Sequence, residues 1–391
     1  MKVLMISDVY FPRVNGVSTS MQTFRKELGN LGVDVTLAVP DYGSNQEPDE
    51  SIVRIPSSRV LLDPEDRMMS YGAAKNVANM LPERDYDLIH IQTPFVAHYA
   101  GCSISRELGI PSVTTYHTYF EEYFHHYIPF LPAAWLKGAA RRFSRKQCEA
   151  VDAIVVPSHA MAKTLLDYGV KMEMHIIPTG IPEEMFAGGD AEGFRKEQRI
   201  EEGRKILLFV GRVAFEKSIG FLIRAAQIAK QEVPGLLLLI AGEGPAEDSL
   251  KRLTSQAGMN EHVRFIGYLD RKDRLKDCYA AADAFVFASR TETQGLVLLE
   301  AMAAAKPVIS TAFMGTKDIL TEESGAIVPE EDENEFAAAM VRVLQDEELR
   351  KEMSGKSLRH AMTWRSGAMA EKMARLYAGL TGKIQTMQDL G

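Results

Sequence analysis

The sequence predicts an α/β protein made of two domains of similar size, each built on a doubly wound parallel sheet. Two observations carry this prediction. Short apolar runs alternate with longer amphipathic segments along the 391 residues, which is typical of parallel strands joined by helices. The alternation stops in a polar, glycine-containing stretch at residues 182–205 and then restarts, which indicates a boundary between two such domains.

In the first half, seven short apolar runs have the length and composition of buried strands. They are Val3–Ser7, Val35–Val39, Ile52–Ile55, Leu88–Gln92, Ser112–Tyr116, Ala153–Pro157 and His175–Pro178. Helical patterns lie between most of them, for example at Thr19–Leu31, Phe95–Leu108 and Ala133–Ala150. We therefore expect a Rossmann-like domain over residues 1–181.

In the second half, the same alternation predicts a second Rossmann-like domain over residues 182–364. Its expected strands are Ile206–Val210, Leu236–Ala241, Val263–Ile266, Ala284–Ala288, Val308–Ser310 and Ala326–Val328. Its expected helices are Ser218–Gln231, Ala246–Ser255, Lys272–Ala281, Gly295–Ala304 and Glu335–Gln345. The helical pattern at Thr363–Leu380 has no strand partner. We expect residues 365–391 to pack back on the first domain.

The composition is that of an ordinary globular protein, with 46% hydrophobic and 25% charged residues. The spacing of Cys102, Cys148 and Cys278 fits neither a zinc site nor a disulfide framework, which favours reduced thiols in the cytoplasm. The first residues enter a strand directly, and no run approaches the roughly 20 apolar residues of a membrane span. The net charge of −8 argues against a nucleic-acid partner. A cytoplasmic protein, soluble or peripheral to a membrane, is expected.

The most informative loop follows the strand Ala284–Ala288, because ligands of open α/β sheets bind beyond the carboxyl ends of the strands. Thr293 is the expected N-cap of the helix that follows. The amides of Gln294, Gly295 and Leu296 would then be free to bind oxygens of an anion or a sugar.

Two glutamates flank this helix start. Glu292 directly precedes it and could accept hydrogen bonds from sugar hydroxyls, and Glu300, on its second turn, could reach a ribose diol. A plainer alternative stays open on the sequence alone: Glu292 caps the helix and Glu300 is a solvated surface charge.

A second loop, Gly211–Ser218, follows the strand Ile206–Val210. Glycine there lets the backbone approach a ligand, and Arg212 and Lys217 could both bind a diphosphate. Two surface cations near a helix start are the alternative.

Two loops of the first domain are also candidates. Gly16 lies between the first strand and the first helix, in a loop that lacks the G-x-G-x-x-G dinucleotide fingerprint. It could approach a phosphate or belong to a plain βα turn. His117 follows the strand Ser112–Tyr116 and could face a ligand or be structural. Asp8, Glu121 and Glu122 are further carboxylates near these strand ends. No cluster of His, Cys and carboxylates indicates a metal.

Together these loops resemble family 4 of the retaining glycosyltransferases, which have the GT-B fold, with two Rossmann-like domains facing each other across a cleft. The resemblance covers nearly the whole chain. Its specific parts are Gly211-Arg212-x₄-Lys217 and Glu292-x₇-Glu300, the latter followed by Ala301-Met302-Ala303 and Lys306-Pro307-Val308-Ile309. Departures are Ala305 and Met314, at positions where the family often has glycine.

The resemblance implies a nucleotide-sugar donor, a UDP-hexose as first choice, and no cofactor or metal. It implies that Arg212 and Lys217 bind the diphosphate, Glu292 the sugar and Glu300 the ribose. Further donor contacts are implied for Gly16, Phe265, Gly267, Thr293, Gln294, Gly295 and Leu296, and a contact near the anomeric carbon for His117. The implied mechanism is front-face transfer with retention, in which the donor's own β-phosphate takes the acceptor proton.

The acceptor is indicated by an aromatic loop and the basic helix that follows it, which together suit an anionic membrane surface. The residues assigned to acceptor or membrane are Tyr119, Tyr123, His126, Tyr127, Trp135, Lys137, Arg141 and Arg142. The alternative is an aromatic packing cluster beside a solvated basic face. The pattern His117-Thr118-x-x-Glu121-x-Tyr123-x-x-His126-Tyr127 resembles the bacterial diacylglycerol glucosyltransferases. This resemblance favours glucosyl transfer from UDP-glucose to a lipid such as diacylglycerol, at the inner face of the cell membrane.

Other readings stay open. Sulfoquinovosyl, galactosyl or mannosyl transfer to lipid would use the same site. A mannosyl, galactosyl or N-acetylhexosaminyl transferase could also act on a soluble acceptor or a polysaccharide precursor. From a different class, a sugar-nucleotide epimerase or a binding protein of the GT-B fold would not transfer sugar at all. The sequence gives no oligomeric state.

Overall fold

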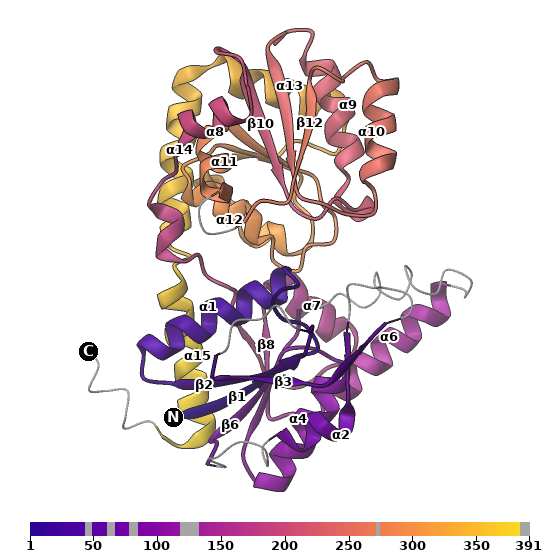
Figure 1. Ribbon diagram of the computed structural model, residues 1–391, viewed down its shortest axis with the longest axis vertical. Helices are drawn as coiled ribbons and strands as arrows, with labels where there is room; N and C mark the ends of the chain where they lie inside the picture. The colour runs from indigo at the N-terminus through magenta and orange to yellow at the C-terminus, as the bar shows by residue number, and fades with distance from the viewer. Residues whose placement is uncertain (44–48, 61–66, 78–84, 118–132, 271–273, 384–391) are drawn as a thin grey trace. The chain divides into compact units, whose positions relative to one another are not determined.

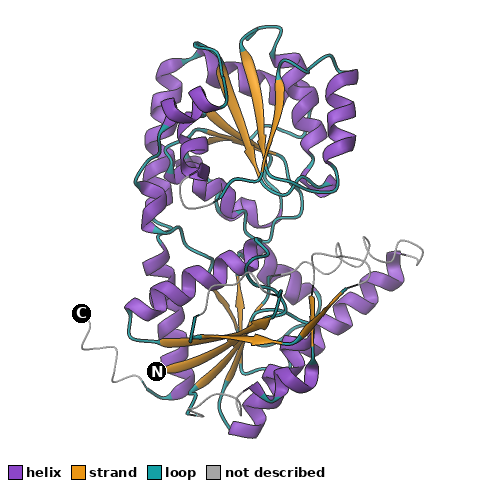
Figure 2. Cartoon of the chain, viewed as in Figure 1, coloured by secondary structure: helices purple, strands orange, loops and turns teal. Residues whose placement is uncertain are grey.

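The computed structural model describes residues 1–43, 49–60, 67–77, 85–117, 133–270 and 274–383, without the side chains of residues 133–136. The chain divides into two compact units (Figure 1). The first consists of Met1–Gly180 and Ser366–Gly391, and the second of Ile181–Arg365. In each unit, helices lie on both faces of a sheet whose strands are all parallel, as predicted (Figure 2).

The sheet of the first unit has the strand order β3-β2-β1-β6-β7-β8-β9. Its strands are β1 (Lys2–Ile6), β2 (Asp34–Pro40), β3 (Ile52–Ile55), β6 (Leu88–Ile91), β7 (Ser112–Thr115), β8 (Ala153–Val156) and β9 (Met174–Ile176). Every predicted strand of this half is present with ends within two residues. A short antiparallel hairpin of β4 (Ser57–Arg59) and β5 (Arg67–Met69), which the sequence did not predict, lies outside this sheet.

The helices of the first unit are α1 (Gly16–Asn30), α2 (Tyr71–Lys75), α4 (Val96–Leu108), α6 (Ala133–Cys148), α7 (His159–Asp167) and α15 (Ser366–Thr381). Helix α1 begins three residues earlier than predicted because Asn15 and Ser18 form a capping box. The Ser18 amide donates to Asn15 Oδ1 at 2.9 Å, and the Asn15 amide donates to Ser18 Oγ at 3.0 Å. Gly16 is therefore the first helical residue and not part of the loop.

Helix α15 packs in the core of the first unit although it follows the second unit in sequence. Its buried Met373 and Tyr377 share a hydrophobic cluster with Phe24 of α1. The Tyr377 hydroxyl also forms a 2.6 Å hydrogen bond with Nδ1 of His90, which is buried on β6. Both apolar contact and a buried hydrogen bond therefore hold this helix.

The sheet of the second unit has the order β12-β11-β10-β13-β14-β15. Its strands are β10 (Lys205–Val210), β11 (Leu236–Ala241), β12 (Val263–Gly267), β13 (Ala284–Phe287), β14 (Val308–Ser310) and β15 (Ala326–Ile327). These strands match the predicted ones with ends within one residue. The core residues of β10, β11 and β13 form a continuous apolar cluster with the helices that cover them.

The helices of the second unit are α8 (Ala191–Glu197), α9 (Ile219–Ala229), α10 (Glu247–Gln256), α11 (Arg274–Ala281), α12 (Leu296–Ala303), α13 (Glu333–Gln345) and α14 (Glu347–Met362). Short 3₁₀ turns are η1 (Glu183–Phe186), η2 (Phe215–Lys217), η3 (Met314–Asp318) and η4 (Glu322–Ser324). The predicted linker at 182–205 thus contains η1 and α8, and α14 was not predicted. Within the described residues, no helix is both long and apolar enough to cross a lipid bilayer.

Candidate active site

The loops that follow β10 and β13 bring Lys217 and Glu292 together. The two strands are neighbours in the sheet, so their carboxyl ends lie side by side although 75 residues separate the two side chains. Lys217 Nζ lies 2.5 Å from Glu292 Oε1. The side chains are only 19% and 18% exposed, which makes this a shielded ion pair at the strand ends where ligands of such sheets bind.

The electrostatics of this pair favour the charged form of Glu292. Burial alone would raise the pKa of the Glu292 carboxyl, because a charge is costly away from water. The charge and hydrogen bond of Lys217 outweigh burial and hold this pKa below its ordinary value. Glu292 is therefore a carboxylate at neutral pH and can accept hydrogen bonds.

Helix α12 starts later than the predicted N-cap allows. Its N-cap is Gly295, in the left-handed region at φ +97°, so the prediction of Thr293 as N-cap is wrong. The left-handed backbone favours glycine here, and an added Cβ would be crowded at 3.0 Å from Thr316 Cγ2. The loop before the helix is held by the amide of Gly315, which donates to the Glu292 carbonyl at 2.9 Å.

The helix start offers backbone donors beside Glu292. Leu296 is the first helical residue, and amides in the first turn of a helix lack intrahelical acceptors and carry partial positive charge. Gln294 is buried next to Gly295, and Leu296 is half-buried. The predicted donor segment therefore combines one carboxylate with a helix N-terminus.

Glu300 lies deeper than a surface charge. It is 1% exposed on the second turn of α12, and Tyr279 of α11 donates a 3.0 Å hydrogen bond to its Oε2. The alternative of a solvated Glu300 is therefore wrong. In this structure the carboxylate joins α12 to α11.

Both positions where the family often has glycine show why glycine would suit them. Ala305, after α12, has φ +56°, and Met314, at the start of η3, has φ +49°. Residues with a side chain are strained in this left-handed region. Ala305 and Met314 are therefore two strained residues in the loops after α12 and β14.

The loop after β10 is joined to a loop that the sequence analysis did not assign to the site. Gly211 donates its amide to Ala241 at 3.0 Å, and Val213 donates to the Glu243 carbonyl at 2.9 Å. An added Cβ at Gly242 would lie 1.9 Å from the Gly211 carbonyl oxygen, so no larger residue fits there. Glycines directly after the predicted strand Leu236–Ala241 were the available signal. The exposed side chain of Arg212 extends from this joined pair of loops.

Strand β12, which carries the predicted donor contacts Phe265 and Gly267, ends beside the same loop. The Gly242 amide donates to the Gly267 carbonyl at 2.7 Å, and Gly267 has φ +69°. The Phe265 ring lies below the Lys251 ammonium, 5.7 Å from the ring centroid. The structure therefore gathers Arg212, Lys217, Gly267 and the α12 start on loops at one end of the second sheet.

In the first unit, Asp8 and Thr93 form a buried pair at the ends of β1 and β6. Thr93 Oγ1 donates to Asp8 Oδ2 at 2.8 Å, and the Ala97 amide of α4 donates to the same carboxyl at 3.2 Å. Burial raises the pKa of Asp8 to about 6, although these hydrogen bonds act in the opposite direction. Asp8 thus caps α4 from a neighbouring strand.

His117 lies at the end of β7 and is held by Gln92, which follows β6. Nε2 of His117 is 3.1 Å from Gln92 Oε1, so this nitrogen carries the proton and donates. Burial lowers the pKa of His117 to about 4. The imidazole is therefore neutral near pH 7, with Nδ1 as its remaining acceptor.

Among the residues that the structure describes, none makes glycine necessary at position 16. An added Cβ there would meet no atom within 4 Å among the described residues, and φ lies outside the left-handed region.

The basic helix α6 presents cations to solvent. Lys137, Arg141 and Arg142 are exposed, and the guanidinium of Arg141 lies 5.6 Å from the centroid of the Tyr168 ring. Buried positions such as Ala140 and Ser144 face the unit's interior. The assigned aromatic-loop residues Tyr119, Tyr123, His126 and Tyr127, and the side chain of Trp135, lie outside the described residues. So do Glu121 and Glu122.

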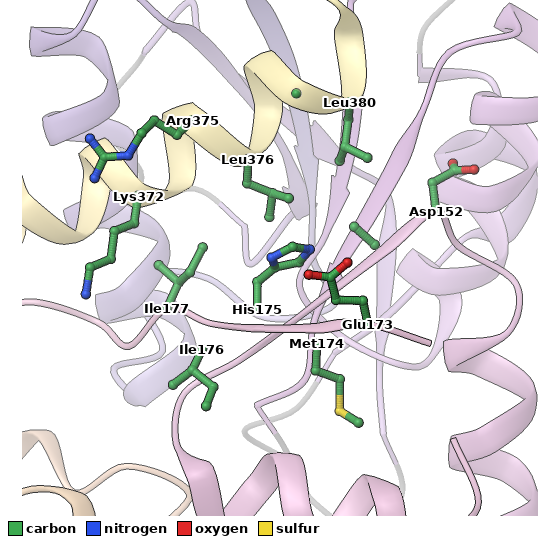
Figure 3. Close-up of a pocket in the computed structure, with 12 residues that line it drawn as sticks. Asp152, Glu173, Met174, His175, Ile176, Ile177, Lys372, Arg375, Leu376 and Leu380 are labelled. Atoms are coloured by element: carbon green, nitrogen blue, oxygen red, sulfur yellow. The ribbon is translucent and has the colours of Figure 1, made fainter. Parts of the chain in front are cut away.

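A cavity of about 780 Å³ opens elsewhere in the first unit, between β9 and α15 (Figure 3). Lys372 and Arg375 project from α15, and Glu173 and His175 lie on the side of β9. Asp152 and Glu173 directly precede β8 and β9, so part of the cavity lies at the amino ends of these strands. Ligands of open α/β sheets bind at the opposite ends. Across the described part of the chain, no predicted site residue lines this cavity.

The residues that the structure describes contain no group of three His, Cys, Asp or Glu side chains that could hold a metal ion. The described loops of the second unit present a shielded ion pair, an arginine and backbone amides, which can bind a negatively charged group and hydroxyls. The first unit presents a neutral histidine.

Two family profiles cover most of the chain. Residues 14–185 match "Glycosyltransferase Family 4", and residues 190–359 match "Glycosyl transferases group 1". The two matched ranges fall almost entirely within the first and the second unit, respectively.

Curated proteins with similar sequences include glycolipid synthases and mannosyltransferases. An α-monoglucosyldiacylglycerol synthase of Streptococcus pneumoniae is 34% identical over 79% of this chain and 71% of its own length. A second one, from Acholeplasma laidlawii, is 27% identical over 79% of this chain and 80% of its own length. A GDP-mannose-dependent α-mannosyltransferase of Mycobacterium tuberculosis is 27% identical, covering 84% of each chain.

Solved structures share the fold. Sucrose-phosphate synthase of Thermosynechococcus elongatus has a TM-score of 0.81 at 21% identity, over 98% of this chain and 99% of its own. The Anabaena protein HepE, solved in complex with UDP-glucose, has a TM-score of 0.75 at 15% identity, over 97% of this chain and all of its own. The chain therefore belongs to family 4 of the glycosyltransferases and has the GT-B fold.

Proposed function

We propose that the protein is a retaining, metal-independent hexosyltransferase that moves glucose from UDP-glucose to a membrane lipid such as diacylglycerol. The observation that carries the donor half of this proposal is the Lys217–Glu292 pair beside the start of α12. This pair combines a cation suited to phosphate with a carboxylate suited to hydroxyls, and it lies beside a helix N-terminus, which favours anions.

In the proposed donor complex, Arg212 and Lys217 bind the diphosphate and Glu292 accepts hydrogen bonds from sugar hydroxyls. The amides of Gln294, Gly295 and Leu296 bind sugar and phosphate oxygens, with Thr293 beside them. Glu300 turns from Tyr279 to the ribose. Backbone at Phe265 and Gly267 meets the base, and Gly16 approaches the diphosphate. Nδ1 of neutral His117 accepts a hydrogen bond from a sugar hydroxyl near the anomeric carbon.

In the proposed reaction, the bond between the anomeric carbon and the β-phosphate oxygen breaks, and its electron pair leaves with the nucleoside diphosphate. The acceptor hydroxyl bonds to the same face of the sugar. Its proton passes to the departing β-phosphate, so no protein nucleophile is needed. Arg212 and Lys217 stabilise the negative charge that develops on the leaving group, which is the largest contribution such a site can make.

The lipid acceptor is supported by α6 and by the relatives. Exposed Lys137, Arg141 and Arg142 suit a surface of anionic lipid, where each cation near the surface contributes about 1 kcal/mol. Two curated relatives are named α-monoglucosyldiacylglycerol synthase. A peripheral location at the inner face of the membrane follows from this acceptor.

The donor is the part of the proposal with a competing candidate, because a mannosyltransferase that uses GDP-mannose is also among the relatives. A screen decides between them. UDP-glucose, UDP-galactose and GDP-mannose are each offered with diacylglycerol liposomes, and the product mass is read. We expect glucosyl-diacylglycerol from UDP-glucose. Product only with a water-soluble acceptor, or only from GDP-mannose, would contradict the proposal.

The membrane contact has its own test in sedimentation with anionic liposomes. Reversing the charge of Lys137, Arg141 and Arg142 to glutamate should weaken binding, and added salt should weaken wild-type binding. The matched control reverses three cations on one helix of the other unit, Lys351, Lys356 and Arg359 of α14. Equal losses in both variants, or binding insensitive to salt, would rule out α6 as the contact.

A further inference from the structure

The two residues assigned to opposite ends of the donor are each other's partner in the ligand-free protein. Lys217 is proposed to bind the diphosphate and Glu292 the sugar, yet Nζ and Oε1 are 2.5 Å apart. Both side chains are more than four-fifths shielded from water. A donor must therefore enter a site in which its two main charged ligands already neutralise each other.

Binding of a nucleoside diphosphate without sugar should cost free energy at this ion pair. An ammonium has three donors, and each one that turns to phosphate weakens the hold of Lys217 on Glu292. The Glu292 carboxylate then stays in a shielded place, near the negative phosphates and with less of its counter-ion. Partly uncompensated buried charge is costly. Burial raises the pKa of Glu292, and Lys217 acts against burial and is the main group that lowers it.

The intact donor differs because its sugar can compensate Glu292. Its phosphates again draw Lys217 away, but its sugar brings hydroxyl groups that donate hydrogen bonds to the Glu292 oxygens. Hydrogen bonds to a charged group are roughly twice as strong as those between neutral groups. Hydrogen bonds from the sugar therefore replace the Lys217 contact that Glu292 loses to the phosphates.

We propose that the Lys217–Glu292 ion pair makes the site discriminate between the intact nucleotide-sugar and the nucleoside diphosphate left after transfer. The pair disfavours the product because the product compensates only one of its members, and product release is thereby promoted. This inference rests on the proposed donor site and adds a specificity role that neither residue has alone.

The consequence is an affinity gain in a variant that loses activity. Glu292→Gln removes the carboxylate charge and frees Lys217 for phosphate. We expect UDP to bind this variant about tenfold tighter than the wild type, and UDP-glucose to bind no tighter. The wild-type preference for UDP-glucose over UDP should therefore shrink or reverse.

The experiment measures UDP and UDP-glucose affinities of the full chain by titration calorimetry, with GDP and GDP-mannose in parallel. The variants are Glu292→Gln, Lys217→Met and the double variant. In the double variant the gain for UDP should vanish, because no lysine remains to be freed. Glu333→Gln is the matched control, since it removes the partner of Arg224 in an exposed 2.5 Å ion pair of the same unit. It should change neither affinity.

Unchanged or weaker UDP binding by Glu292→Gln would overturn the inference while leaving the donor site intact. So would a gain that persists without Lys217, because charge removal alone would explain it. If the wild type binds neither UDP nor GDP and neither of their sugars, the proposed function fails and the inference with it. Glu292→Ala repeats the measurement should the glutamine variant fail to fold.

Discussion

The titratable groups at the strand ends of the two units have pKa values shifted in different ways, although both sheets are parallel and doubly wound. In the second unit, a carboxylate is kept charged: Lys217 on the neighbouring strand end holds the pKa of Glu292 low. In the first unit, burial favours the neutral forms of Asp8 and His117. It raises the pKa of Asp8 to about 6 and lowers that of His117 to about 4. The neighbours of those two groups are a hydroxyl and an amide.

The difference shows that the residue on the neighbouring strand end determines the direction of the pKa shift. Burial acts on all three groups in the same sense, against charge. Only Glu292, with an opposite charge on the adjacent strand end, has its pKa shifted toward the charged form. An opposite charge on the neighbouring strand end can therefore reverse the effect of burial on a pKa.

The largest expected effect breaks the charged side of this comparison. Lys217→Ala should lower kcat/KM by about 10²–10³, because it removes the cation that would stabilise the leaving diphosphate. Glu292→Ala should act similarly through the sugar. Steady-state transfer assays with glucosyl product read by mass measure both variants, with circular dichroism to show that they fold.

The matched control for this loss is Arg224→Ala, which breaks the ion pair with Glu333 between α9 and α13. Exposed pairs contribute little to stability, so this variant should keep its activity. Near-normal kcat/KM in Lys217→Ala, or an equal loss in Arg224→Ala, would remove the donor-site assignment.

A second, smaller effect concerns the neutral side. Burial lowers the pKa of His90 to about 3 and of His98 and His117 to about 4. Below about pH 6.5, the unfolded chain binds protons that these folded imidazoles do not, so the free energy of unfolding falls as pH falls. Each buried imidazole contributes at most about 1.4 kcal/mol per pH unit in that window. Asp8, with its raised pKa, acts in the opposite direction between about 4 and 6.

Thermal midpoints at pH 7, 6 and 5 test this, with His98→Leu as the variant. His98 is buried in α4, and leucine there removes one imidazole that must stay neutral. Its midpoint should depend less on pH than that of the wild type. His159→Gln, at an exposed histidine of α7, serves as the control. An unchanged slope in His98→Leu, or a similar flattening in the control, would contradict the account.

The fold was predictable because its strands are buried apolar runs. Leu236–Ala241, for instance, has six buried residues in succession, and such a run cannot be placed anywhere but in a sheet interior or a buried helix. The elements that were missed lack this signal. Helix α14 is mostly polar and buries only Met353, Ser357 and Ala361, and α8 buries only Phe194. Their positions depend on tertiary contacts that periodicity does not show.

The sequence selects candidate site residues but does not show which of them contact each other. Motif spacing singled out Lys217 and Glu292, yet only the strand order, with β10 beside β13, makes them an ion pair. The pairs of Asp8 with Thr93 and of His117 with Gln92 likewise join different strand ends. Thr293 was predicted as a cap from residue type, whereas a left-handed glycine two residues later sets the helix start.

The smallest effect sharpens the neutral side of the comparison at Gln92. The Gln92 carbonyl oxygen holds Nε2 of His117 at 3.1 Å and so fixes which nitrogen is left as an acceptor. Gln92→Leu should lower kcat/KM by about tenfold, because the imidazole then loses its fixed orientation. Gln92→Glu keeps the acceptor but adds a negative charge, which should raise the pKa of His117 and move the acidic limb of the pH–rate profile to higher pH.

Gln147→Leu removes another buried glutamine, one that donates to the Pro94 carbonyl, and should cost stability without moving kcat/KM or the profile. If Gln92→Leu behaved like Gln147→Leu, and Gln92→Glu left the profile in place, Gln92 would be a packing residue and the neutral histidine would owe its orientation to something else.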